Sequence, residues 1–158
     1  MEPEKLTFRK AGQDDCKDVY RLICELECKC LSYRDFSRIY GDQTENRNYY
    51  CLVCEYENQV AGVLNLRFEG QLHDAKRIAE IMEFVVDSGF RRMGIGKEMF
   101  SRACRLAQDF SCAQIELATN RLREEAHRFY EREGMHSHHF KFSKSLSGID
   151  DAENVIGR

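Results

Sequence analysis

The stretch that decides the fold is Val85-Val86-Asp87-Ser88-Gly89-Phe90-Arg91-Arg92-Met93-Gly94-Ile95-Gly96-Lys97. An apolar segment typical of a buried strand ends in a cationic turn with glycines, and a helical pattern begins directly after it. The first amides of a helix have no partner within the helix and carry partial positive charge, so they attract phosphate. Gly94 and Gly96 lack the Cβ atoms that would keep a bulky anion away from those amides. The stretch therefore predicts a strand, an anion-binding loop and a helix.

This loop matches neither of the two common nucleotide motifs, G-x-x-x-x-G-K-[ST] and G-x-G-x-x-G. Arg-x-x-Gly-x-Gly after a strand instead resembles the pyrophosphate loop of the GNAT acetyltransferases, which bind acetyl-CoA. A glycine-rich turn alone can also be plain structure, so the segments downstream decide between the two readings. The resemblance implies that the cofactor loop comprises Arg91, Arg92, Met93, Gly94, Ile95, Gly96 and Lys97. We also expect the pantetheine arm of CoA to pair, like an added strand, with the main chain of Phe84, Val85 and Val86.

Two further segments follow in the order that this superfamily shows. Residues 114–118 alternate polar and apolar side chains, as a strand does, and lead to Asn120. Ala126, Phe129 and Tyr130 then share one face of a predicted helix, and Gly134 is placed to end it. This segment resembles the second CoA-binding segment of the superfamily, which implies that Asn120 contacts pantetheine amides and that Tyr130 protonates the departing thiolate.

Acetyl transfer to an amine also requires a proton acceptor, and Glu80 and Glu83 are the candidates. On a regular strand these two side chains point to opposite faces, although a bulge near Val85 would change that assignment. Glu80 lies where the resemblance implies the general base of the histone-acetylating branch. We therefore predict Glu80 and Tyr130 as catalytic residues and give Glu83 a structural or substrate-contacting role.

The chain as a whole, from about Leu6 to Leu146, resembles the aminoalkylphosphonate N-acetyltransferases. The segments that carry this closer resemblance are residues 19–26, 72–73, 78–86, 126–134 and 139–146. It implies an aminoalkylphosphonate acceptor, and it leaves open whether a divalent metal ion assists. A phosphonate needs local positive charge, because the net charge of the chain is −3. The candidate substrate residues are Arg47, Arg67, His73, Glu83, His138 and His139.

Hydrophobic periodicity predicts one α/β domain over residues 1–146 and a polar C-terminal tail over residues 147–158, and the resemblance implies that the domain has the GNAT fold. We expect a mixed, mostly antiparallel sheet of about seven strands with helices on both faces. The predicted strands are 6–10, 49–56, 60–68, 77–86, 114–118 and a pair near 135–145. The predicted helices are 16–30, a short one after Ser32, 97–110 and 124–133, and the predicted polar loops are 41–48 and 69–76.

Composition excludes several other classes of protein. The slightly acidic chain gives no general attraction to nucleic acid or to a membrane surface, and no apolar run reaches the length of a bilayer span. The N-terminus does not resemble a signal peptide, so we expect a cytoplasmic protein with reduced thiols. Cys51 and Cys54 fall on opposite faces of a predicted strand, which argues against a shared zinc ion. The eight cysteines are better explained as small, free apolar side chains.

Three functions remain to be separated. The first is N-acetylation of a small-molecule amine, with aminoalkylphosphonates favoured. The second is N-acetylation of a protein or peptide, which needs an open groove beside Glu80. The third is a non-catalytic CoA sensor or a thiol-rich metal-binding module. The presence of Glu80 and Tyr130 argues against the sensor, and the opposite faces of Cys51 and Cys54 argue against the metal-binding module. The sequence leaves a homodimer open.

Overall fold

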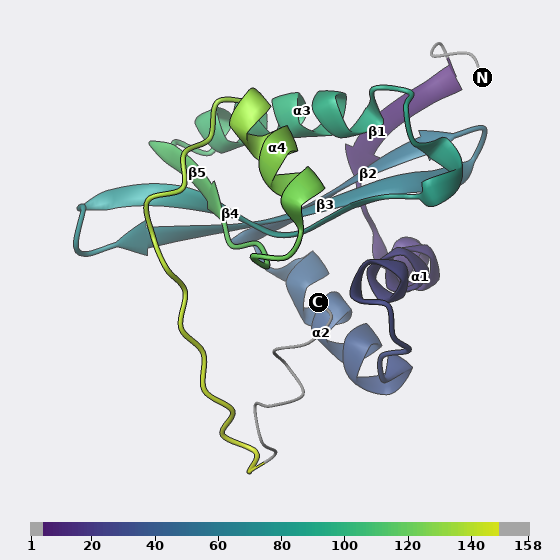
Figure 1. The fold of residues 1–158 in the computed structure, drawn as a ribbon. Coiled ribbons are helices and arrows are strands. Elements are labelled where there is room, and N and C mark those ends of the chain that lie inside the picture. Colours follow the sequence, from purple (N-terminus) through teal and green to yellow (C-terminus); the bar gives the residue numbers. More distant parts are fainter. Residues whose placement is uncertain (1–4, 149–158) are drawn as a thin grey trace. The chain divides into compact units, whose positions relative to one another are not determined.

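A computed structural model describes residues 5–148, which divide into one unit ending at Leu117 and a second beginning at Ala118. The first unit is built on a sheet of five strands in sequential order (Figure 1). The first four pair antiparallel, and the last pair is parallel, so the sheet is mixed and mostly antiparallel as predicted. The strands are β1 (Leu6–Lys10), β2 (Tyr49–Tyr56), β3 (Gln59–Gln71), β4 (Lys76–Val86) and β5 (Gln114–Leu117).

Helices cover both faces of this sheet, which confirms that part of the prediction (Figure 1). One face carries α1 (Cys16–Glu27) and α2 (Tyr33–Glu45), and the other carries α3 (Ile95–Asp109). Leu22 and Ile23 of α1 join Val53 and Val63 of the sheet in a buried apolar cluster. The α3 face is packed so closely that a Cβ at Gly62 would lie 2.7 Å from the sulfur of Met99. Two short 3-10 helices, η2 (Gln13–Asp15) and η3 (Ser88–Phe90), complete the unit.

Several predicted boundaries were wrong because packing overrides local propensity. The predicted loop at 41–48 begins only after Glu45, since α2 continues through Gly41 while its apolar face packs on β2. Ser32 does cap this helix, its hydroxyl accepting a hydrogen bond from the amide of Asp35. The second predicted loop is shorter than expected, because β3 and β4 continue their hairpin as far as the Gln71–Lys76 pair.

One irregularity in the sheet changes which side chains share a face. β3 and β4 pair in register until a shift between Asn65 and Leu66 of β3, where the partner jumps from Glu83 to Ile81. Met82 is therefore the extra residue of a β-bulge. The sequence analysis had allowed for a bulge near Val85, and the structure places it three residues earlier.

The second unit, as far as residue 148, contains one helix, α4 (Glu124–Arg132). Gly134 follows it with a φ of +90°, a conformation that glycine adopts readily at a helix end, so its predicted role is confirmed. Residues 135–148 form no strand, and the predicted strand pair near 135–145 is therefore wrong for the part of the chain that the structure describes. The sheet thus has five strands rather than about seven. Most of the predicted tail, residues 149–158, lies outside the described residues.

The cysteines match the sequence interpretation. All eight are free thiols. Cys54 pairs with Gly62, on the α3 face of the sheet, whereas Cys51 pairs with Asn65 on the α1–α2 face. Burial raises the pKa of the Cys51 thiol to about 12, so this side chain stays protonated and behaves as a small apolar group.

Candidate active site

The predicted anion-binding loop joins β4 to α3 as expected. Gly94 takes the left-handed conformation, with a φ of +75°, and is the residue that immediately precedes α3. The helix begins at Ile95, so the amides of the first turn include those of Gly96 and Lys97. Arg91, Arg92, Gly94 and Lys97 are exposed, Met93 and Gly96 are partly exposed, and Ile95 is buried. The loop therefore presents a helix N-terminus and three cationic side chains to solvent, which suits a pyrophosphate.

The start of this loop is fixed by an ion pair with α1. The Asp87 carboxylate accepts a hydrogen bond from the Arg21 guanidinium at 2.8 Å and another from the amide of Gly89 at 2.8 Å. Those hydrogen bonds hold the pKa of Asp87 below its usual range, against the opposing effect of burial. The sequence analysis missed this anchor, because the two partners are separated by 66 residues.

β5 pairs with only the first part of the neighbouring edge of β4. β4 and β5 pair in parallel from Ile78–Gln114 to Ile81–Leu117, where β5 ends. β4 runs on to Val86, so within residues 5–117 its last five residues have β3 as a neighbour but not β5. These include Phe84, Val85 and Val86, the segment predicted to pair with pantetheine.

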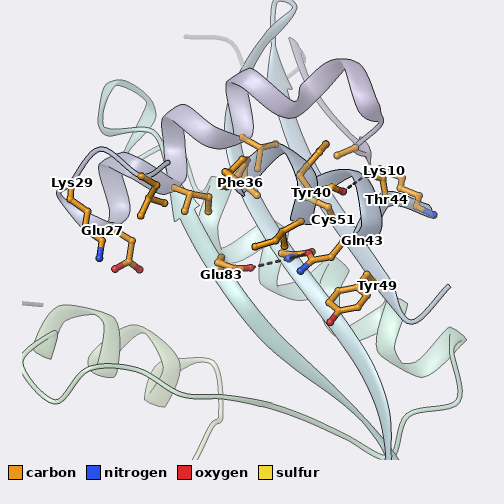
Figure 2. Close-up of a pocket in the computed structure, with 17 residues that line it drawn as sticks. Lys10, Glu27, Lys29, Phe36, Tyr40, Gln43, Thr44, Tyr49, Cys51 and Glu83 are labelled. Carbon is orange, nitrogen blue, oxygen red and sulfur yellow. Dashed lines mark hydrogen bonds between the residues drawn. The ribbon is translucent and has the colours of Figure 1, made fainter. Parts of the chain in front are cut away.

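On the α1–α2 face of the sheet, a cavity of about 330 Å³ lies between the strands and these two helices (Figure 2). Its lining is mostly apolar and comes from α1, from α2 and from the facing side chains of β2, β3 and β4. Glu83 is a polar residue of the cavity and comes from β4. Glu27 and Lys29 lie together in the view of Figure 2, and Lys10 and Thr44 lie on the other side of it.

Glu83 is held by a short chain of side-chain hydrogen bonds. The Asn65 amide donates to the Glu83 carboxylate at 2.9 Å and to the Gln43 side-chain oxygen at 3.0 Å, which connects β4, β3 and α2 (Figure 2). Burial raises the pKa of Glu83, the hydrogen bond from Asn65 lowers it, and the charges of Glu27 and Glu80 raise it further. The net shift is upward, which is the direction that makes a carboxylate a better proton acceptor near neutral pH.

Glu80 has a different environment. Its carboxylate accepts a hydrogen bond from the Arg67 guanidinium at 2.6 Å, and Arg67 also lies 3.4 Å from a carboxylate oxygen of Glu69. Arg67 thus already pairs with two acidic side chains. Glu80 and Glu83 lie on the same face of β4, so the expectation for a regular strand was wrong, and the bulge at Met82 is the reason.

The predicted residues of the second unit lie in and before α4. The Asn120 side-chain oxygen accepts a hydrogen bond from the amide of Leu122 at 2.9 Å, and its main-chain oxygen lies 2.8 Å from a ring nitrogen of His127. Tyr130 is partly buried, and its ring meets Phe129 edge-on at 5.5 Å. Burial raises the pKa of Tyr130, so its phenol stays protonated at neutral pH.

The cationic side chains predicted to bind the phosphonate either do not line the α1–α2 cavity or belong to the second unit. Arg47 and His73 are exposed, and a ring nitrogen of His73 lies 3.6 Å from the Asp74 carboxylate. In the second unit His138 and His139 are exposed, with ring centroids 6.4 Å apart. Among residues 5–148 there is no group of three or more His, Cys, Asp or Glu side chains that could hold a metal ion.

The sequence did not predict the cavity. The sequence predicted only a short helix after Ser32, and Asn65 and Gln43 were not singled out. The pattern Phe36, Ile39, Tyr40, Gln43 on one face of α2 was a usable signal, because a polar residue that continues an apolar stripe faces the interior. No helix in the described part of the chain has the length and apolar composition needed to cross a membrane.

Comparisons with known proteins agree with this geometry. Residues 17–135 match the model of the acetyltransferase (GNAT) family. The chain is 36% identical over 139 residues to the aminoalkylphosphonate N-acetyltransferase of Salmonella typhimurium, covering 88% of this chain and 90% of that protein.

Two solved structures share the fold, each at 21% identity. A transcriptional regulator from Bacillus halodurans has a TM-score of 0.82, with 89% of this chain and 99% of that chain covered. An aminoglycoside acetyltransferase from an uncultured soil metagenomic sample has a TM-score of 0.77, with 90% and 99% covered. With the family match over most of its length, the chain belongs to the GNAT family of acetyl-CoA-dependent N-acetyltransferases.

Proposed function

We propose that the acetyl acceptor is the primary amine of a small molecule, which occupies the α1–α2 cavity and reaches Glu83. The observation that carries this proposal is a partly buried carboxylate, with a raised pKa, in a cavity of about 330 Å³. That volume falls in the range of small-molecule sites. A peptide terminus, the alternative acceptor, belongs in the same test panel.

In this proposal Glu83 accepts the proton of the ammonium group, which frees the nitrogen lone pair for attack. The sequence placed this role at Glu80, but Glu80 is engaged by Arg67, whereas Glu83 faces the cavity. Acetyl-CoA, when bound, supplies the acetyl thioester. The nitrogen forms a bond to the acetyl carbon, the carbon–sulfur bond breaks, and the Tyr130 phenol gives its proton to the departing sulfur. The nitrogen of the new amide loses its second proton, which replaces the proton that Tyr130 gave up.

The loop before α3 and the end of β4 support a site for acetyl-CoA. The N-terminus of α3, with Gly94 in the left-handed conformation and Arg91, Arg92 and Lys97 exposed, suits the pyrophosphate. The β4 edge from Phe84 to Val86, beyond the end of its pairing with β5, suits the pantetheine arm. We further propose that Asn120 contacts the pantetheine amides.

An aminoalkylphosphonate is the acceptor class that the Salmonella relative supports. Lys29 lines the cavity beside Glu27 and can supply positive charge for the phosphonate, whereas the predicted Arg47, Arg67 and His73 of the same unit do not line it. A phosphonate carries more negative charge than a carboxylate and so gains more from each such contact.

The test compares 2-aminoethylphosphonate with β-alanine, which has the same carbon chain and a carboxylate, in an assay of thiol release from acetyl-CoA. We expect the phosphonate to have the higher kcat/KM, and we expect Lys29→Ala to reduce that preference. A chelator should have the same effect if a metal ion takes part. Equal kcat/KM for both acceptors would contradict the phosphonate class and leave amine acetylation standing.

A further inference from the structure

The aminoalkylphosphonate proposal explains the charged groups of the cavity but not its apolar wall. Val19 and Ile23 of α1, with Phe36, Ile39 and Tyr40 of α2, form most of that wall. A two-carbon phosphonate has almost no apolar surface to place against these side chains, yet apolar surface gains free energy when it leaves water.

The aromatic part of this wall is held in place. The rings of Phe36 and Tyr40 stack with centroids 6.1 Å apart and planes 13° apart, and Tyr20 meets Phe36 edge-on at 5.2 Å. The Tyr40 hydroxyl donates a hydrogen bond of 2.6 Å to the main-chain oxygen of Gly12. A surface fixed in this way is pre-organised, so a ligand that packs on it loses little free energy in ordering it.

Two carboxylates make one part of the cavity negatively charged. Glu83 and Glu27 both line it, and they are close enough for the charge of Glu27 to act on Glu83. An ammonium group is attracted to that pair. Beside them, Lys29 lies next to Glu27, and Lys10 lies on the other side of the cavity, with its ammonium group 5.4 Å from the centroid of the Tyr50 ring (Figure 2). A second positive charge on the ligand would find no carboxylate along the apolar wall, whereas a neutral, apolar distal group would pack against it.

We propose that the α1–α2 cavity binds primary amines with an apolar, uncharged body, such as arylalkylamines, as a class of acceptor in addition to aminoalkylphosphonates. The amine lies at Glu83 and Glu27, and the apolar body packs against Ile23, Phe36 and Ile39. This inference rests on the proposed function, because it uses the same cavity and the same proton acceptor. It also predicts that diamines are poor acceptors.

The experiment uses amines that share a two-carbon chain and differ at the distal end. Ethylamine has no distal group, 2-phenylethylamine has an aromatic ring, and ethylenediamine has a second ammonium. Burying a ring is worth roughly tenfold or more in affinity. We therefore expect kcat/KM for 2-phenylethylamine to exceed that for ethylamine by about tenfold or more, and ethylenediamine to be the poorest of the three.

Two variants test whether the preference for 2-phenylethylamine arises in the cavity. Phe36→Ala and Ile39→Ser should each lower the ratio of 2-phenylethylamine to ethylamine efficiency toward one. Ile39 is 48% exposed, so its substitution keeps the test valid if Phe36→Ala does not fold. Leu72→Ser is the matched control, because Leu72 is a fully exposed aliphatic residue in the β3–β4 turn and should leave the ratio unchanged.

A binding measurement separates failure of this inference from failure of the proposed function. Calorimetry with CoA-saturated protein should show tighter binding of 2-phenylethylamine than of ethylamine, whether or not turnover occurs. If no amine releases thiol, the proposed function fails, and the calorimetric ratio still decides the inference. If amines turn over but 2-phenylethylamine neither binds nor reacts better than ethylamine, the inference is overturned and the proposed function stands.

Discussion

Glu80 and Glu83 lie on the same face of β4, although three positions along a regular strand would place them on opposite faces. The bulge at Met82 causes this, since Glu83 pairs with Asn65 and Glu80 pairs with Arg67, and those two partners alternate regularly on β3. Both carboxylates therefore lie on the α1–α2 side of the sheet. Glu80 is compensated by an arginine, whereas Glu83 is held by an amide and lines the cavity.

The raised pKa of Glu83 makes a prediction about stability. Burial favours the protonated form in the folded protein, so the folded pKa lies above the unfolded one. The folded state then binds more protons between the two values, and the free energy of unfolding falls as the pH rises from the unfolded pKa to the folded one. Glu83→Gln removes this penalty. We expect its Tm, relative to the parent, to be higher at pH 7.5 than at pH 4, whereas a constant difference across pH would contradict the assigned shift.

Asn65 should act through Glu83 as a positioning residue. Its hydrogen bond lowers the pKa of Glu83, so Asn65→Leu, which keeps the volume and removes the donor, should raise that pKa further. A hydrogen bond to the carboxylate favours its charged form, so without it the acid limb of the pH dependence of kcat/KM should move upward. Gln43→Ala removes the outer link only and should produce a smaller movement. A lower rate with an unmoved acid limb would assign Asn65 a merely structural role.

The loop glycines should govern cofactor affinity. Gly96→Val places a branched side chain in the first turn of α3, and we expect acetyl-CoA to bind about tenfold more weakly, a loss of about 1.4 kcal/mol. Gly94→Ala forces a Cβ into a φ of +75° and should cost about 1 kcal/mol in stability as well. Gly70→Ala is the control, because a Cβ there meets nothing within 4 Å. Calorimetric affinities equal to the parent for Gly96→Val would remove the loop from the cofactor site.

Tyr130 should matter for turnover and not for cofactor binding. Tyr130→Phe deletes the phenolic proton, and we expect kcat to fall by about 10²-fold, a typical contribution of a general acid, with the acetyl-CoA affinity within about twofold of the parent. Tyr33→Phe is the control, because Tyr33 is an exposed tyrosine that does not line the cavity. An unchanged kcat for Tyr130→Phe would transfer proton donation to water or to another group.

The sequence predicted the strand–loop–helix around Gly94 because each of its parts has a local signature. An apolar strand, a glycine with positive φ and an amphipathic helix follow one another within a short stretch. The predicted strands at 49–56 and 60–68, which pair as β2 and β3, and the helix end at Gly134 are correct for the same reason. The predicted strands near 135–145 failed because alternation of apolar residues does not supply a pairing partner, and Phe140 and Phe142 are exposed.

The cavity and the choice between the two carboxylates could not be predicted from the sequence. The shared face of the two carboxylates depends on the bulge at Met82, and the neighbouring residues carry no glycine or proline that would mark it. The contact of Asn65 with Gln43 joins residues 22 positions apart through the packing of α2 on the sheet. Such contacts are set by tertiary structure, and a periodic pattern shows only the face on which each residue lies.

The measurement that tests the central claim most directly is thiol release from acetyl-CoA with a small primary amine, compared between Glu83→Gln and Glu80→Gln. If Glu83 accepts the proton, Glu83→Gln should lower kcat/KM by about 10²-fold near neutral pH, and the loss should shrink as the pH rises and free amine becomes abundant. Glu80→Gln should have a smaller effect, because Glu80 pairs with Arg67. Glu83→Gln with parental activity across the pH range, alongside a large loss in Glu80→Gln, would contradict the account and return the role to Glu80.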